Sequence, residues 1–410
     1  MKVTLINHSD SLGGASVVTF RLMQALRRLG VDAQMLVTSK TTGDAAVMQA
    51  APRWRSRLPF LAEHLEIFAR NGMSRDDLFK VSIATVGLPL SRHPLVRGAD
   101  AVILNWVNQG MLSLNEIARI ADTKPTIWTM HDMWNMTGVC HHAGTCDRYM
   151  THCADCPLLH SSAGEHDLSA RTFDRKMRLY HDSRIHFVAV SSWLAERASS
   201  SALMRDADMS VIPNPFFIDE ASEAPSMTRA EAGLPAEGRL VVMCAARLDD
   251  PVKGLLVAVE AFNRLARPDI VPVFVGALRD QHALDGLRCR YVHTGPISDR
   301  QRMRAIYHHA SAVLSTSSYE SFGATLVEGQ AAGCVPVAFV HDGRSDIVTD
   351  GETGYTAVYP DANGIARAIA RAIDDPIEPA RLVGHARRFS WQQVGRQYIG
   401  LLESLISRRS

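Results

Sequence analysis

The sequence predicts an α/β protein with two similar domains, each a doubly wound parallel sheet. Three observations support this prediction. First, the chain has 410 residues, which is too long for one ordinary hydrophobic core. Second, short apolar runs alternate with amphipathic stretches in both halves, the pattern of parallel sheets connected by helices. Third, the segment Pro213–Pro215 interrupts this rhythm, which restarts after it, so we expect a linker there.

These observations give approximate domain limits. We expect an N-terminal domain over residues 1–210 and a C-terminal domain over residues 211–389. A long helix at about 390–410 follows the complete second domain, and we expect it to pack back on the N-terminal domain.

The composition narrows the class of protein. Hydrophobic residues make up 46% and charged residues 21%, ordinary values for a globular protein in water. A net charge of +1 gives no global electrostatic reason to expect nucleic acid as the partner. The first residues read as a strand and a glycine turn rather than a signal peptide, and no apolar run reaches transmembrane length. We therefore expect a cytoplasmic protein.

The first elements form a βαβ unit. A strand at Lys2–Asn7 precedes the sequence SLGGAS, a helix at Ala15–Leu29 and a strand at Gln34–Val37. Gly13 and Gly14 at the first turn would let the backbone approach a ligand phosphate or sugar. A plain tight turn is the alternative, because the pattern falls short of G-x-G-x-x-G.

An amphipathic helix, WRSRLPFLAEHLEIF, lies in the irregular and partly basic segment 53–97. We favour a helix that packs within the protein, because Glu63, His64 and Glu66 dilute its basic face. The alternative is a platform on a membrane surface for a lipid-linked substrate.

Two further buried strands, Asp100–Trp106 and Pro125–Met130, end in polar or aromatic residues. His131 and Asp132 follow the second of them. They could be an active-site pair in which Asp132 fixes the imidazole, or a turn with a capping aspartate.

Four of the seven cysteines lie close together, interleaved with histidines, at Cys140, Cys146, Cys153 and Cys156. The C-x2-C end resembles half a structural zinc knuckle. The other spacings are not those of a standard zinc finger. Free thiols packed in a loop, or disulfides in an exported protein, are therefore the alternatives.

A cationic pair follows the first strand of the second half, Leu240–Ala245. The sequence ARLDDPVKG places Arg247 and Lys253 six positions apart at the carboxyl end of that strand. An Arg and a Lys aimed at one point suit a diphosphate leaving group, whereas the alternative is a solvated loop. Lys253 is the only lysine after Lys176, which favours the functional interpretation.

The stretch VLSTSSYESFGATLVEGQAAGCVP reads as strand, loop, helix and strand. The strand covers Val313–Ser317, the loop Ser318–Phe322 and the helix Gly323–Ala332. A helix N-terminus beyond a strand end attracts anions. Glu320 and Glu328 are better explained by sugar or ribose hydroxyls, which donate hydrogen bonds to carboxylates. A loop glutamate and a solvated helix glutamate are the alternative.

Taken together, GGAS, HD, R-x5-KG, ESFGATLVEG and AAGCVPV resemble the retaining glycosyltransferases of family 4. The segments HDMWNMTGVCH and HPLVRGADAVILNWVNQG are most similar to bacterial exopolysaccharide and colanic-acid-type transferases. Asn105 and Gln109 depart from the usual form of the second segment. The resemblance implies a GT-B fold, two Rossmann-like domains facing one another across a cleft. It also implies a nucleoside-diphosphate sugar donor, no cofactor essential for catalysis, and retention at the anomeric carbon.

The resemblance also implies residue roles. Arg247 and Lys253 would bind the diphosphate, and Glu328 the ribose hydroxyls. Glu320 would bind the donor sugar together with the backbone of Ser321, Phe322, Gly323 and Ala324. His131 would lie near the sugar and the acceptor. Gly13 and Gly14 would close over the phosphates, and the backbone near Pro296 and Ile297 would meet the base.

The implied function is sugar transfer to a saccharide or polyprenyl-linked saccharide acceptor in bacterial surface polysaccharide biosynthesis. The resemblance also implies peripheral contact with the inner face of the membrane, and it implies no nucleic-acid partner. Alternatives are a nucleotide-sugar epimerase and a non-catalytic nucleotide-sugar-binding subunit. A phosphorylase would need a lysine to hold pyridoxal phosphate, and Lys253 is the only candidate in the second half.

Overall fold

Both halves of the chain form an all-parallel sheet in the computed structural model. The structure describes residues 1–160 and 163–409, and within them the strands form one seven-stranded and one six-stranded sheet. The chain divides into two units. Unit 1 contains Met1–Pro215 and Val394–Ser410, and unit 2 contains Phe216–Gln393. The two doubly wound sheets confirm the predicted fold class.

The sheet of unit 1 has the strand order β3-β2-β1-β4-β5-β6-β7. Its strands are β1 (Lys2–Ser9), β2 (Asp32–Ser39), β3 (Val47–Gln49), β4 (Ala101–Leu104), β5 (Thr126–Met130), β6 (Ile185–Ala189) and β7 (Met209–Val211). Its helices are α1 (Gly14–Arg28), α2 (Arg53–Arg70), α3 (Pro94–Gly98), α4 (Leu114–Thr123), α5 (Leu168–Asp182) and α6 (Ser192–Ser200), and most of α13 (Trp391–Ser407) belongs to this unit.

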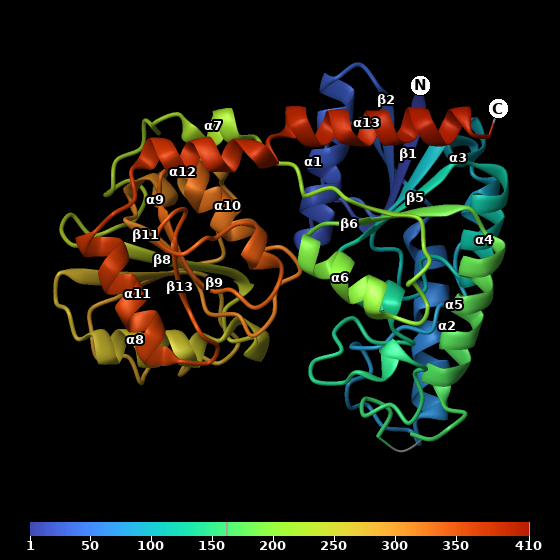
Figure 1. The fold of residues 1–410 in the computed structure, drawn as a ribbon, viewed down its shortest axis with the longest axis horizontal. Coiled ribbons are helices and arrows are strands. Elements are labelled where there is room, and N and C mark those ends of the chain that lie inside the picture. Colours follow the sequence, from blue (N-terminus) through green and yellow to red (C-terminus); the bar gives the residue numbers. More distant parts are fainter. Residues whose placement is uncertain (161–162, 410) are drawn as a thin grey trace. The chain divides into compact units, whose positions relative to one another are not determined.

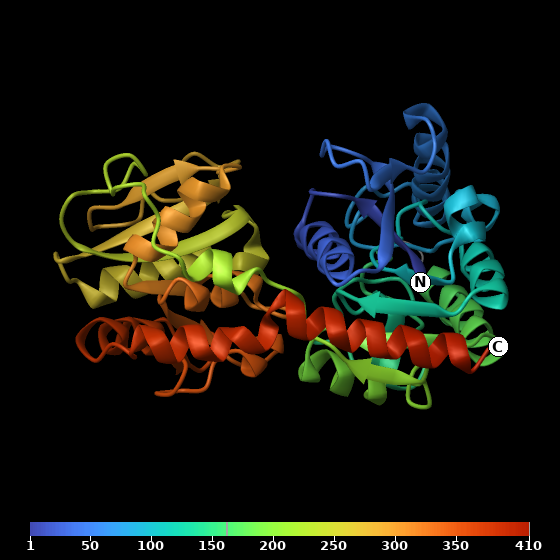
Figure 2. The same cartoon turned by 90° about the horizontal axis from the view of Figure 1, so that it is seen from above.

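The end of the chain packs on unit 1, as predicted. Val394, Tyr398 and Leu402 of α13 join the same hydrophobic core as α1 and the central strands. The buried hydroxyl groups of Tyr398 and Thr129 lie 3.0 Å apart, which ties the helix to β5. Figure 2 shows α13 in red running along this unit.

The sheet of unit 2 has the strand order β10-β9-β8-β11-β12-β13. Its strands are β8 (Arg239–Arg247), β9 (Ile270–Ala277), β10 (Val292–Gly295), β11 (Ala312–Ser315), β12 (Val335–Phe339) and β13 (Tyr355–Ala357). Its helices are α7 (Ile218–Ser222), α8 (Leu255–Leu265), α9 (Arg300–His309), α10 (Ala324–Ala331), α11 (Ala362–Asp374) and α12 (Pro379–Ala386). They cover both faces of the sheet (Figure 1).

Both sheets reverse their strand order at one point, between β1 and β4 in unit 1 and between β8 and β11 in unit 2. Open parallel sheets bind ligands beyond the carboxyl ends of the strands at such a reversal, because the loops on its two sides diverge there. The register pairs Ile6 with Leu104 and Met243 with Leu314, so the loops that follow these strands begin side by side. Among the predicted site residues, these loops carry Gly13, Lys253, Glu320, Ser321, Phe322 and Gly323.

The sequence did not predict several elements. The strands β3, β7 and β13 are three residues each, too short to show a period. Helices α5 and α12 were also missed.

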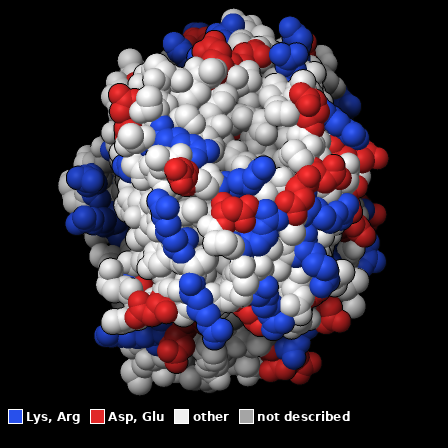
Figure 3. Space-filling view, turned by 90° about the vertical axis from the view of Figure 1, so that its left-hand side faces the viewer, with Lys and Arg blue, Asp and Glu red and all other residues white. Residues whose placement is uncertain are grey.

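The face drawn in Figure 3 carries acidic and basic side chains next to one another rather than a field of one sign, which agrees with the net charge of +1.

Of the helices in the described ranges, none combines the length and the apolar character that a membrane crossing needs.

Candidate functional site

Lys253 and Glu320 meet at the strand reversal of unit 2. Lys253 ends a short 3-10 turn, Pro251–Lys253, beyond β8, and Glu320 lies in the loop beyond β11. The ammonium group of Lys253 donates a 2.8 Å hydrogen bond to Oε1 of Glu320, which also accepts one of 2.8 Å from the hydroxyl of Ser317. Burial raises the pKa of Glu320, but the charge and hydrogen bond of Lys253 outweigh it and leave the pKa below its usual value. Glu320 is therefore ionised at neutral pH.

A buried ion pair fixes the loop that carries Glu320. The guanidinium of Arg344, with its side chain 0% exposed, donates bonds of 2.8 and 2.7 Å to the two oxygens of Asp342. Arg344 also donates to the carbonyl oxygen of Ser317 at 2.8 Å, and Asp342 accepts from the backbone amide of Glu320 at 2.8 Å. This pair was not predicted, because HDGRSD reads as an ordinary polar turn.

Two glycines allow the loops to approach each other. Gly254 has φ +68°, and a Cβ atom there would lie 2.1 Å from the carbonyl oxygen of Thr316. A Cβ atom on Gly343 would lie 2.1 Å from the carbonyl oxygen of Ser321. Any side chain at either position would push the Glu320 loop away from Lys253 or from Arg344.

Arg247 is engaged by two acids of its own loop. Its guanidinium forms ion pairs with Asp250 at 3.1 Å and with Asp249 at 3.6 Å. Both acids belong to the same loop, so a diphosphate would have to replace them as the partner of Arg247. That Arg247 and Lys253 aim at one point stays a prediction.

The other predicted residues of unit 2 surround the same strand ends. Gly323, with φ +104°, caps the N-terminus of α10, where exposed amides favour an anion. Phe322 is 4% exposed and stacks on Phe216, so only its backbone could serve a ligand. Glu328 on α10 accepts a 3.4 Å hydrogen bond from the hydroxyl of Tyr307. Pro296 and Ile297 directly follow β10, and Ser321 and Ala324 flank the cap of α10.

The glycine turn of unit 1 lies beyond β1. Gly13 has φ +88° and caps α1, and a Cβ atom on Gly13 or Gly14 would meet nothing within 4 Å. Open space over both glycines leaves room for a ligand. Asp10, which the sequence analysis did not single out, anchors this turn. It is 1% exposed and accepts hydrogen bonds from the amides and hydroxyls of Thr41 and Thr42.

The partner of Asp132 differs from the one proposed from sequence. Oδ2 of Asp132 accepts a 2.8 Å hydrogen bond from Nδ1 of His141 and a 3.0 Å bond from the indole of Trp106. His131 instead donates from Nε2 to Oδ1 of Asn105 at 3.1 Å. Asn105 thus has a definite function, although it departs from the expected family pattern. Asp132 fixes the imidazole of His141 in the cysteine loop, and its Oδ1 accepts a 2.8 Å bond from the amide of Trp134, as the alternative of a capping aspartate predicts.

The protonation states of this cluster follow from burial. Burial lowers the pKa of His131 to about 4 although Asp132 opposes it, so His131 is neutral at pH 7. Burial raises the pKa of Asp132, but the charge and hydrogen bond of His141 outweigh this and bring it to about 2. The cluster therefore combines one permanent carboxylate with a neutral imidazole at the carboxyl edge of the sheet.

The cysteine loop holds free thiols. Cys140, Cys146, Cys153 and Cys156 form no disulfide, and Sγ of Cys153 accepts a hydrogen bond from the amide of Gly138. Within residues 1–160 and 163–409, no three His, Cys, Asp or Glu side chains gather as metal ligands would. Burial raises the pKa of Cys140 and Cys153 to about 11. The geometry favours packed thiols and gives the zinc hypothesis no support.

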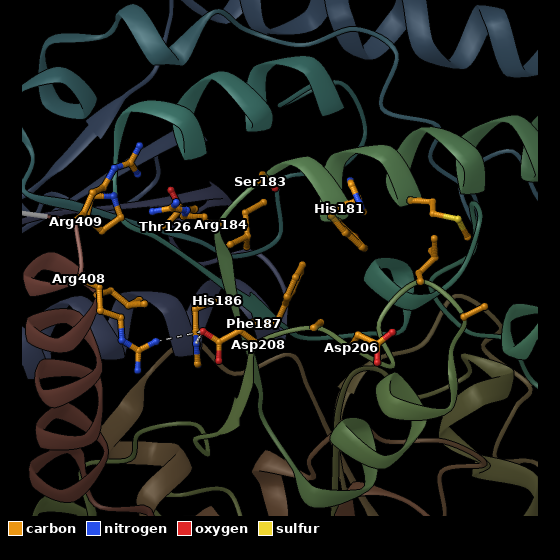
Figure 4. Close-up of a pocket in the computed structure, with 18 residues that line it drawn as sticks. Thr126, His181, Ser183, Arg184, His186, Phe187, Asp206, Asp208, Arg408 and Arg409 are labelled. Carbon is orange, nitrogen blue, oxygen red and sulfur yellow. Dashed lines mark ion pairs between the residues drawn. The ribbon is translucent and has the colours of Figure 1, made fainter.

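A separate cavity of about 550 Å³ lies at the opposite edge of the unit 1 sheet. Figure 4 shows it beside the first residues of β5 and β6 and the last turn of α13. Asp208 in its wall pairs with His186 at 2.9 Å and with Arg408 at 3.7 Å. Because it opens at the amino ends of the strands, this cavity is not part of the strand-end cluster.

Comparison with solved structures identifies the class of fold. The chain superposes on sucrose-phosphate synthase from Thermosynechococcus elongatus with a TM-score of 0.66 and 18% identity, over 99% of both chains. It superposes on Anabaena Alr3699/HepE in complex with UDP and glucose with a TM-score of 0.64 and 18% identity, over 98% of this chain and 100% of the other. At such identities the likeness shows the fold alone, which is the GT-B fold.

Sequence comparison matches part of the chain to one family. Residues 228–389 match the family described as "Glycosyl transferases group 1". Among curated proteins, a phosphatidyl-myo-inositol mannosyltransferase from Mycolicibacterium smegmatis is 31% identical in an alignment of 256 residues that covers 58% of this chain and 62% of that protein. The chain thus matches less than two thirds of that relative. These matches relate unit 2 to the group 1 glycosyltransferases.

Proposed function

We propose that the protein is a retaining glycosyltransferase that uses a nucleoside-diphosphate sugar as donor. The observation that carries the proposal is the Lys253–Glu320 pair at the strand reversal of unit 2, next to the N-terminus of α10. A cation and helix amides there suit a diphosphate, and a carboxylate held by that cation suits sugar hydroxyls. The family match of unit 2 supports the same chemistry.

The proposed roles follow the surroundings of each residue. Lys253 and Arg247 hold the diphosphate, and stabilise the charge that grows on it as the bond to the sugar breaks. Glu320 and the backbone of Ser321–Ala324 hold the donor sugar. Glu328 accepts the ribose hydroxyls, while the backbone at Pro296 and Ile297 meets the base. No residue in this set needs a metal ion to carry out its role.

In the proposed reaction the acceptor hydroxyl attacks the anomeric carbon from the face that the diphosphate leaves. The carbon–oxygen bond to the diphosphate breaks, the bond to the acceptor oxygen forms, and the hydroxyl proton passes to the departing phosphate oxygen. Unit 1 supplies the acceptor side. His131, fixed by Asn105, is the group we assign to the acceptor, and the glycine turn Gly13–Gly14 closes over the phosphates.

We propose a saccharide or lipid-linked saccharide as acceptor, in the synthesis of a bacterial surface polysaccharide. The segments around His131 that resemble exopolysaccharide transferases support this assignment. A curated relative named for phosphatidyl-myo-inositol acts, by its name, on a lipid that carries a phosphate.

A donor screen tests this function. Nucleoside-diphosphate sugars are added singly, and thermal stability and nucleoside-diphosphate release are measured with and without acceptor. A ligand at 100 times its dissociation constant should add roughly 2.7 kcal/mol to the free energy of unfolding. If a changed donor sugar is released without acceptor, an epimerase is favoured, and if all donors bind without turnover, a non-catalytic subunit is.

A further inference from the structure

Helix α2 presents an apolar stripe to solvent. Trp54, Leu58, Leu61 and Leu65 are 65%, 57%, 59% and 66% exposed. Their spacing of four, three and four positions places them on one face of the helix. Such a stripe normally packs on a core, and its full exposure indicates a partner that the isolated chain lacks. We call these four residues the α2 stripe.

Basic residues accompany the stripe without acidic ones. Residues 51–62 include Arg53, Arg55 and Arg57, all exposed, and contain neither Asp nor Glu. Glu63 faces inward, 0% exposed, and accepts hydrogen bonds from the hydroxyl of Ser82 and the amide of Ile83.

The next acid along the helix is also engaged. Glu66 pairs with Arg70 at 3.2 Å, so its charge is balanced on the helix itself. The acids that favoured internal packing of this helix therefore do not dilute its exposed face. The interpretation that this helix packs within the protein therefore does not hold for the α2 stripe.

A small cavity of about 190 Å³ lies between α2 and the carboxyl ends of β1 and β2. Its wall combines cationic, hydroxyl and aromatic groups, from His8, Thr38, Ser39, Arg53, Ser56, Arg57 and Phe60. In the described ranges the side chains of Arg53 and Arg57 make no ion pair or hydrogen bond. Cavities for whole ligands usually exceed about 300 Å³, so this one fits a head group.

The cavity and the stripe occupy neighbouring faces of one helix. At 3.6 residues per turn, Arg53 and Arg57 lie roughly a quarter turn from the centre of the stripe. A molecule with a phosphate in the cavity can thus continue into the apolar layer that the stripe would enter. Guanidinium groups suit a phosphate because their planar donors match its oxygens.

His8 adds a group for a neighbouring hydroxyl. The hydroxyl of Thr38 donates to the carbonyl oxygen of His8 at 2.7 Å, so its oxygen accepts from Nδ1 of His8 at 3.2 Å. Nε2 of His8 is left as a hydrogen-bond acceptor. A sugar hydroxyl next to the phosphate can donate to it.

We propose that this cavity binds the phosphate of a lipid-phosphate acceptor, while the α2 stripe enters the surface of an anionic bilayer that holds the lipid. The inference rests on the proposed glycosyltransferase function and deepens it by naming the acceptor class. The proposed source of the phosphate is a lipid, because a water-soluble acceptor would leave the α2 stripe exposed to water.

Vesicle binding tests the stripe. The full chain is sedimented with phosphatidylglycerol vesicles and with phosphatidylcholine vesicles, together with the variant Leu58→Ser/Leu61→Ser. The control Leu256→Ser/Val358→Ser changes two apolar residues of unit 2 that are 76% and 80% exposed. We expect binding to phosphatidylglycerol only, and a loss of about tenfold or more in the stripe variant but not in the control. Equal binding by the two variants would overturn the assignment of the stripe.

Titration with a water-soluble lipid phosphate, dihexanoyl phosphatidic acid, tests the cavity. Arg53→Ala/Arg57→Ala is compared with Arg178→Ala/Arg184→Ala, which removes the same charge from other exposed positions of unit 1. We expect about tenfold or more weaker binding in the first pair only. Equal weakening in both pairs would reduce the effect to net charge and contradict the site.

Two further measurements distinguish a failure of this inference from a failure of the proposed function. Inorganic phosphate is titrated in parallel, and if it binds as tightly as the lipid phosphate, a water-soluble acceptor is favoured and the lipid part of the proposal is wrong. Nucleoside-diphosphate affinity is measured in the same preparations. If the unmodified chain does not bind nucleoside diphosphate, the proposed function of unit 2 is contradicted. If it binds nucleoside diphosphate but not the lipid, only this inference is contradicted.

Discussion

Nζ of Lys253 and Oε1 of Glu320 lie 2.8 Å apart and join the loops beyond two adjacent strands, β8 and β11. The contact has two consequences. It keeps Glu320 ionised and fixes the direction of a long, flexible lysine side chain before any ligand arrives. Preorganised charge of this kind lowers a barrier because it needs no rearrangement when charge develops.

Replacing Lys253 by Ala should reduce kcat by roughly a hundredfold or more, because a preorganised cation at the leaving group is lost. Arg247→Ala should act similarly, although Arg247 must first leave Asp249 and Asp250. Steady-state kinetics measure both, with Arg264→Ala, whose guanidinium pairs with Glu260 on the surface, as control. Near-normal turnover in both site variants would refute the diphosphate assignment.

Glu328→Gln should weaken nucleotide binding and leave the acceptor KM unchanged. An amide accepts hydrogen bonds from ribose hydroxyls less well than a carboxylate does. Calorimetric titration with the nucleoside diphosphate gives the first quantity, and acceptor saturation curves give the second. The assignment of Glu328 is wrong if only the acceptor constant moves.

Arg344→Met should lower the free energy of unfolding by about 3–5 kcal/mol, because it leaves the Asp342 carboxylate buried without its partner. The double variant Arg344→Met/Asp342→Asn should recover part of this loss, since no unpaired charge remains. Chemical denaturation of both proteins measures the effect. A single variant as stable as the parent would show that the pair does not hold the Glu320 loop.

The depressed pKa of His131 predicts a loss of stability in acid. The folded pKa is about 4 and the ordinary value is 6.5, so between these pH values the unfolded chain binds more protons. The contribution of neutral His131 to the free energy of unfolding is therefore complete above pH 6.5 and is lost as the pH falls toward 4. At pH 5 the loss amounts to about 2 kcal/mol.

His131→Asn should therefore show a shallower fall in stability than the parent between pH 7 and pH 5. Denaturation curves at several pH values measure the difference. Parallel pH profiles of the two proteins would mean that His131 is not held neutral by burial.

The sequence was enough to predict the fold because alternating apolar runs and amphipathic stretches reflect a buried parallel sheet directly. The same pattern placed Lys253 and Glu320 beyond the ends of two strands, and the structure brings their side chains together. Arg344 was missed, because nothing local in HDGRSD shows that its guanidinium is buried. For Asp132 the sequence left a pair with His131 and a capping role open, and it did not predict that the loop brings His141 to this carboxylate. Long-range partners of this kind depend on tertiary structure.

The stereochemistry of transfer tests the central claim most directly. Proton NMR of the first product formed from an α-linked nucleoside-diphosphate sugar and a defined acceptor gives the anomeric configuration. In unit 2, Lys253 and Glu320 meet at the proposed diphosphate site, and the proposed attack comes from the face on which the diphosphate departs. The account therefore predicts an α-linked product, and a β-linked product from an α-linked donor would contradict it.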